Sequence, residues 1–100
     1  MKITDINLKY QKLVEIYEMA YKRAAEGKGH LRHYRGEPYT EQWICRGIRS
    51  FGLGGAQFQI GKKNEEINVL ETKDQKINEL LDIINYAAAG IIVLMEEEKE

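Results

Sequence analysis

The amino-acid sequence predicts an all-α fold, a small helical bundle of two long and two shorter helices. Apolar residues recur at steps of three and four near both ends of the chain, which is the spacing of one helix face. No segment shows the regular alternation of apolar and polar residues that marks a strand. One hundred residues make a single domain, 1–100, with a small core. The one cysteine, Cys45, excludes an internal disulfide bond.

The first long helix is expected to begin at Thr4, a residue type that caps helix N-termini. Gly27 and Gly29 are expected to end it, because glycine is favoured just beyond a helix C-terminus. A basic, glycine-containing loop then covers residues 27–39. The apolar or small residues of this helix are separated alternately by three and four positions: Ile3, Ile6, Tyr10, Leu13, Tyr17, Ala20 and Ala24.

Two shorter helices are expected in the middle of the chain. The first is capped by Thr40, and Gly52, Gly54 and Gly55 break the chain after it. The second runs from about Ala56 to Leu70. The apolar side of the first consists of Trp43, Ile44, Ile48 and Phe51, and the second is expected to bury Ala56, Ile60, Ile67 and Leu70.

The last helix carries the clearest pattern in the sequence. Thr72 and Gln75 have the spacing of a capping box, which predicts its N-terminus. From Ile83 to Met95 it runs thirteen residues without a charge, too few to span a bilayer, which needs about 20. Its apolar seam comprises Ile77, Leu80, Ile84, Ala87, Ile91 and Leu94, widened by Leu81, Ala88 and Met95.

A second face of this helix differs along its length. Glu79, Asp82 and Tyr86 lie toward the N-terminus, and Ala89 and Val93 follow at about the same angle, at ~100° per residue. The apolar half must be covered, and a chain this short is expected to need a second copy for that, so we predict a homo-oligomer. The acids would then lie at the rim of a helix-lined pocket.

Two carboxylates three positions apart on a helix share one face. Glu79 and Asp82 could therefore share a divalent cation, as phosphate-handling sites often require. The alternative is that both acids pair with Lys73, Lys76 or other basic groups.

The charge is unevenly distributed, although the net charge is only −1. Residues 22–49 carry seven Lys or Arg against three Glu, whereas residues 50–100 carry five Lys against ten acids. This asymmetry suits an anionic, metal-bound ligand or simply a solvated surface. The phosphate candidates are Lys28, Arg32, Arg35, Arg46 and Arg49, since guanidinium groups bind phosphate bidentately. The slightly negative net charge and the absence of a recognised base-reading motif in the sequence argue against binding to duplex nucleic acid.

The runs ELLDIINYAAAGIIVL and Ile60–Glu66 resemble the MazG-like all-α nucleotide pyrophosphohydrolases. The branch with the greatest similarity is called nucleotide modification associated domain 1, and the resemblance covers residues 50–95. It implies Mg²⁺ held by acids of two antiparallel helices around a nucleoside triphosphate. Glu79 and Asp82 would be catalytic and metal-binding, with Glu65 or Glu66 as the opposing acid. The ligand-binding residues would include Lys62, Asn85 and Tyr86; the acid that precedes the lysine in the branch is Gly61 in this chain.

The leading expectation is a cytoplasmic, Mg²⁺-dependent nucleoside triphosphate pyrophosphohydrolase without membrane contact. A second hypothesis is a non-catalytic nucleotide binder that sequesters or regulates on the same scaffold. A third is a helical interaction module, in which residues 83–95 form only a dimer seam and no ligand binds.

Overall fold

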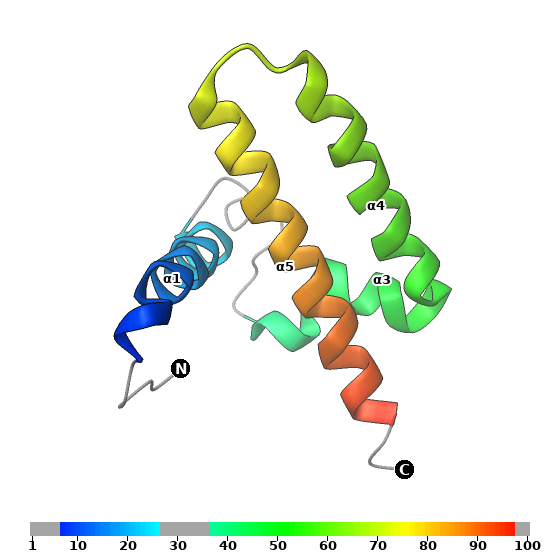
Figure 1. Cartoon of the computed structure of the whole chain (residues 1–100). Coiled ribbons are helices and arrows are strands. Elements are labelled where there is room, and N and C mark those ends of the chain that lie inside the picture. The colour runs from blue at the N-terminus through cyan, green and yellow to red at the C-terminus, as the bar shows by residue number, and fades with distance from the viewer. Residues whose placement is uncertain (1–6, 27–36, 98–100) are drawn as a thin grey trace.

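The computed structural model describes residues 7–26 and 37–97, and within these ranges it confirms the all-α prediction (Figure 1). Four α-helices pack together: α1 (Gln11–Glu26), α3 (Trp43–Phe51), α4 (Leu53–Glu66) and α5 (Lys73–Glu97). Short 3₁₀ turns cover Leu8–Tyr10, Tyr39–Glu41 and Ile67–Val69. None of the described residues forms a strand.

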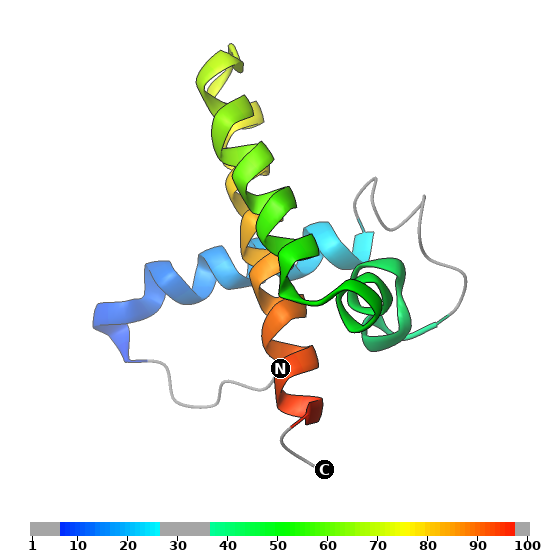
Figure 2. The same ribbon diagram turned by 90° about the vertical axis from the view of Figure 1, so that its right-hand side faces the viewer.

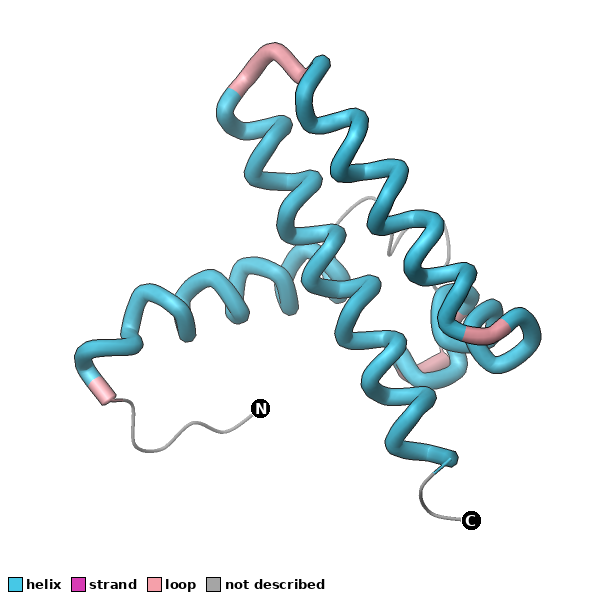
Figure 3. The backbone as a smooth tube through the Cα atoms, turned by 45° about the vertical axis from the view of Figure 1, so that its right-hand side comes forward, coloured by secondary structure: helices cyan, strands magenta, loops and turns pink. Residues whose placement is uncertain are grey.

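Helix α5 is the centre of the fold, since α1, α3 and α4 all contact it. Helices α4 and α5 lie side by side and antiparallel, joined by one short connection (Figures 1 and 3). Helix α1 crosses this pair steeply, and its N-terminal half extends away from it (Figure 2). The middle of α5 is therefore the place where side chains from α1 and α4 can meet.

The predicted capping box at the start of α5 is confirmed. The amide N–H of Gln75 donates to Thr72 Oγ1 over 3.1 Å, and the Thr72 N–H donates to Gln75 Oε1 over 3.2 Å. This reciprocal pair satisfies two amide donors that have no partner within the helix. The expected boundaries of the first helix, Thr4, Gly27 and Gly29, lie outside the described residues.

Only one of the three central glycines interrupts the helices. Gly52 adopts a φ of 80° between α3 and α4, a conformation that glycine tolerates without strain. Gly54 and Gly55 lie inside α4, so the predicted start at Ala56 was three residues late. Helix α4 then passes into a 3₁₀ turn that ends at Val69, one residue before the predicted Leu70.

The core lies where α3, α4 and α5 meet. Its buried residues are Cys45, Ile48, Ala56, Ala89 and Val93, with Tyr39, Ile44 and Ile92 packed against them. Small residues let the helices approach closely: a Cβ added at Gly90 would lie 3.2 Å from Leu53 Cδ2. Trp43 and Phe51 were expected on the apolar side of α3, but they are 63% and 80% exposed.

The predicted cover of the two faces of α5 was wrong in part, although Leu81 of the predicted seam is buried. Ala89 and Val93, expected to need cover from another copy, are buried within the chain. Leu80 and Ile91, expected in the intramolecular seam, are 50% and 57% exposed. Helical periodicity identifies both stripes on such an apolar helix, but it does not say which one the neighbouring helices cover.

Within the described part of the chain, α5 is the one helix long and apolar enough to cross a membrane by length and composition. Core helices of soluble proteins meet the same criterion, but they are mostly buried. Only 22% of the qualifying stretch of α5 is buried inside this chain. The exposed stripe of α5 therefore lacks the cover that a core helix normally has.

Candidate functional site: a cluster of four charges between three helices

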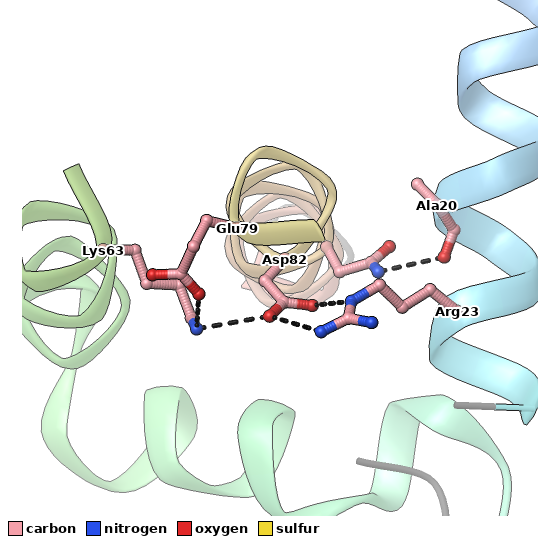
Figure 4. A network of polar contacts seen from close by, with 6 residues as sticks. Ala20, Arg23, Lys63, Glu79 and Asp82 are labelled. Atoms are coloured by element: carbon pink, nitrogen blue, oxygen red, sulfur yellow. Dashed lines mark hydrogen bonds and ion pairs between the residues drawn. The ribbon is translucent and has the colours of Figure 1, made fainter. Parts of the chain in front are cut away.

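Asp82, in the middle of α5, joins the two flanking helices. Its Oδ1 accepts a hydrogen bond of 2.6 Å from Arg23 Nε, and its Oδ2 accepts one of 3.2 Å from Arg23 Nη2. Lys63 Nζ, on α4, lies 3.2 Å from the same Oδ2 (Figure 4). One carboxylate thus accepts hydrogen bonds from two cations, one on each helix that flanks α5.

Glu79 lies one turn before Asp82 and faces the same lysine. Lys63 Nζ is 2.9 Å from Glu79 Oε1, and the two side chains are only 17% and 14% exposed. The other carboxylate oxygen, Glu79 Oε2, is buried and has no hydrogen-bond partner. Arg23, Lys63, Glu79 and Asp82 together form what we call the four-charge cluster.

Polar contacts continue along α5 beyond the four-charge cluster. Asn85 Nδ2 donates to the carbonyl oxygen of Ala20 on α1 over 3.0 Å. The Asn85 carbonyl oxygen accepts a 2.9 Å hydrogen bond from the Tyr39 hydroxyl. Lys63 Nζ lies 5.9 Å from the centre of the Tyr86 ring, within the range of a cation–π contact. The Asn-Tyr pair singled out from the sequence therefore adjoins the two acids.

Neither Arg23 nor Lys63 was among the site residues predicted from the sequence. Lys63 lies seven positions, about two turns, after Ala56, the buried residue of α4, and therefore on the same face of that helix. A charge at such a position needs a partner when it is buried, and that signal could have identified Lys63. Arg23 lies three residues after Ala20, the buried residue of α1, and so projects toward α5.

The ion pairs shift the pKa values of both cations. Burial disfavours the Lys63 ammonium, but hydrogen bonds to Glu79 and Asp82 outweigh it and raise the pKa of Lys63. The hydrogen bond to Asp82 raises the pKa of Arg23 against the opposing effect of burial. Both groups therefore remain charged at neutral pH, and the four-charge cluster carries two positive groups and two carboxyl groups.

The expected third acid does not join this site. Glu65 is exposed, and Glu66 Oε1 lies 3.9 Å from Lys62 Nζ on the surface of α4. The α4 side chain that meets the two acids is Lys63, because it lies on the inner face of the helix. Within residues 7–26 and 37–97, no three acidic, histidine or cysteine side chains are grouped so that they could hold a metal ion. Neither Glu65 nor Glu66 therefore lies opposite Glu79 and Asp82 in this structure.

The phosphate candidates are not gathered at the four-charge cluster. Arg49 binds Glu96 through hydrogen bonds of 2.9 and 2.7 Å, about 21 Å along α5 from Asp82 at 1.5 Å per residue. The contacts with Glu96 join α3 to the end of α5, and a further hydrogen bond from Arg49 to the Thr40 carbonyl oxygen joins α3 to the 3₁₀ turn Tyr39–Glu41. Arg46 is exposed on α3. Lys28, Arg32 and Arg35 lie outside the described residues.

The resemblance implies a bound Mg²⁺ ion, and the candidate ligands for it in this structure are the carboxylates of Glu79 and Asp82. In phosphate-handling sites, Mg²⁺ takes one or two carboxylates and completes its octahedron with water and phosphate oxygens. Glu79 and Asp82 supply two carboxylates, and the buried Glu79 Oε2 is an acceptor without a hydrogen bond. The pair fits a Mg²⁺ ion that is shared with a phosphorylated ligand. It does not form an all-protein metal cage.

The fold and the site define a small all-α protein with a partly buried four-charge cluster at the junction of three helices. Comparison of the chain with protein-family models, with curated proteins and with solved structures found no match. The resemblance to the MazG-like group therefore remains a hypothesis based on the short runs quoted above.

Proposed function

We propose that the four-charge cluster binds the phosphate groups of a nucleotide together with Mg²⁺, and that the protein releases pyrophosphate from a nucleoside triphosphate. The observation that carries this proposal is the approach of Arg23, Lys63, Glu79 and Asp82 from three helices to within hydrogen-bonding distance. Partial burial of four charged side chains costs desolvation energy, which apolar side chains at the same helix junction would not cost. A ligand that binds to these charges would explain their presence there.

Each charge has a distinct role in this proposal. Glu79 and Asp82 hold Mg²⁺, which offsets phosphate charge and polarises a phosphoryl oxygen when it is bound. Arg23 and Lys63 donate to phosphate oxygens, for which charge-assisted hydrogen bonds are strong. Tyr86, which neighbours Lys63, offers an aromatic surface at the edge of the site.

A thermal-shift screen of nucleoside mono-, di- and triphosphates, with and without Mg²⁺, tests the binding. A ligand that prefers the folded chain raises its melting temperature. The rise should need Mg²⁺ and should disappear in Glu79→Gln, while Glu71→Gln, an exposed acid near the start of α5, keeps it. A panel without any shift in the unmutated chain would refute the proposal. Assay of pyrophosphate release from the ligands that bind then tests turnover.

A second candidate is a non-catalytic nucleotide binder, a sequestering or regulatory protein. It is favoured by the absence of a third acid beside Glu79 and Asp82 among the described residues. The resemblance implies acids from both antiparallel helices, whereas α4 presents Lys63 to the two acids of α5. Nucleotide binding without pyrophosphate release in Mg²⁺ or Mn²⁺ would select this candidate.

We also propose that the chain is a cytoplasmic homo-oligomer. The support is the exposed stripe of α5 and the protruding half of α1, where Leu13, Ile16 and Tyr17 are partly exposed. Large exposed apolar patches are rare on monomeric soluble proteins. If no ligand binds and self-association is retained, the helical interaction module becomes the better description.

A further inference from the structure

Lys63 occupies the position between two carboxylates that a shared cation would take. Its Nζ lies 2.9 Å from Glu79 Oε1 and 3.2 Å from Asp82 Oδ2 (Figure 4). It thus bridges one oxygen of each acid. We propose that Lys63 is a built-in competitor of the divalent metal: its ammonium group holds the acid pair in the free protein, and metal enters only when a phosphate gives Lys63 a new partner.

Burial makes the competition strong. The Lys63 side chain is 17% exposed, so a displaced ammonium would not simply return to water. An ammonium that is left buried without an anionic partner carries a large desolvation cost. The Tyr86 ring, 5.9 Å away, is a weak substitute. A phosphate oxygen is a strong one, because it accepts charge-assisted hydrogen bonds.

Charge balance leads to the same conclusion. Arg23 and Lys63 match Glu79 and Asp82, two cations against two acids. A divalent ion alone would leave two uncompensated positive charges in a partly buried site. A triphosphate that arrives with the ion offsets them, and it takes over Lys63 and Arg23 while the acids turn to the metal. Metal and phosphate should therefore bind with positive coupling, and each should raise the affinity for the other.

Mn²⁺ binding to the full chain, followed by the electron paramagnetic resonance signal of the free ion, tests this inference without any turnover. The unmutated chain should bind Mn²⁺ alone weakly. Lys63→Met keeps the length of the side chain and removes its charge, and it should bind Mn²⁺ alone about tenfold more tightly or better, as loss of a competing ion pair implies. Lys22→Met removes an exposed lysine of α1 that has no role in the proposed site, and it should leave the affinity unchanged.

Two further measurements locate the effect. Combining Lys63→Met with Glu79→Gln should abolish the gain, which would place the ion at the acid pair. In the unmutated chain, a non-hydrolysable triphosphate analogue should tighten Mn²⁺ binding beyond what the analogue achieves alone in solution. This second measurement needs no variant, so it tests the coupling of metal and phosphate even if Lys63→Met fails to fold.

Equal Mn²⁺ affinity in the unmutated chain and Lys63→Met would overturn the inference, as would tight binding of Mn²⁺ alone to the unmutated chain. The phosphate half of the inference rests on the proposed function, whereas the competition at the acid pair does not. A gain in Lys63→Met without any effect of the triphosphate analogue would keep the competition and reject nucleotide binding.

Discussion

Arg23 and Asp82, 59 residues apart in the sequence, form a two-point ion pair that fastens α1 to α5. The pair carries much of this attachment, because α1 has Ala20 as its one buried residue within the described chain. A further polar link is the hydrogen bond from Asn85 to the Ala20 carbonyl oxygen. Ion pairing and hydrogen bonding thus add to the apolar contacts that hold α1 on α5.

Replacing Arg23 with Gln should loosen α1 selectively. The expected loss is about 1–2 kcal/mol in the free energy of unfolding, the lower range for hydrogen bonds between charged groups that are partly exposed. Hydrogen exchange should accelerate in residues 11–26 more than in α4 and α5. Lys22→Gln, at an exposed neighbouring position, is the matched control. Uniform acceleration across all helices would contradict a local role.

Asp82→Asn should destabilise the chain more than Glu79→Gln does. Asp82 accepts hydrogen bonds from both Arg23 and Lys63, whereas Glu79 accepts from one of the described residues, Lys63. We expect losses of about 2–3 kcal/mol for Asp82→Asn and about 1 kcal/mol for Glu79→Gln by chemical denaturation. The reverse order would show that Asp82 is not the joint between the helices. If Asp82→Asn loses ligand binding, its stability must also be measured, because unfolding of the variant would abolish binding as well.

Two glycine-to-alanine substitutions should change the free energy of unfolding by different amounts, or in opposite directions. Gly61→Ala places a methyl group in open space on α4, and it should stabilise the chain by about 0.5–1 kcal/mol through helix propensity. Gly90→Ala gains the same propensity but puts its Cβ 3.2 Å from Leu53 Cδ2. Its net gain should be smaller than that of Gly61→Ala, or negative. Equal melting temperatures for the two variants would show that α4 and α5 separate readily at Gly90.

Stability should fall at alkaline pH partly because of Tyr39. Burial raises the pKa of Tyr39 from 10.0 to about 12. The unfolded chain therefore loses the phenol proton first, and the contribution of Tyr39 is complete below pH 10 and lost as pH rises through 12. The raised pKa of Lys63 acts in the same direction.

Tyr39→Phe should make this alkaline loss shallower when unfolding free energy is measured against pH. At neutral pH the substitution should cost about 0.5–1.5 kcal/mol, because the hydrogen bond to the Asn85 carbonyl oxygen is lost. Tyr21→Phe, at an exposed position of α1, should change neither quantity. An unchanged pH profile in Tyr39→Phe would assign the loss to other groups.

Ile91→Glu should break self-association without unfolding the chain. Ile91 is exposed on α5, so a charge there remains solvated in a monomer but is buried in an oligomer. Sedimentation at micromolar concentration should show a reduced mass with helical content retained. Asn78→Glu, at an exposed polar position of the same helix, should keep the oligomer. A monomeric mass for the unmutated chain would reject self-association.

The last helix illustrates what local sequence determined. The Thr72–Gln75 capping box determined where α5 begins, because both hydrogen bonds form within four residues. Apolar spacing likewise predicted the helical class and the two stripes of α5. The left-handed break at Gly52 was predicted within a group of three glycines. These features depend on backbone conformation and short-range contacts, which a sequence pattern records directly.

Only the tertiary structure decided which stripe of α5 is buried and which partners its acids have. Both stripes are apolar enough to form a core, so the choice depends on where α1, α3 and α4 cross the helix. The same crossing brings Lys63 and Arg23 to Glu79 and Asp82 and leaves Glu65 and Glu66 at the surface. Ion pairs between residues 16 to 59 positions apart require the relative placement of whole helices. Helical periodicity contains no information about that placement.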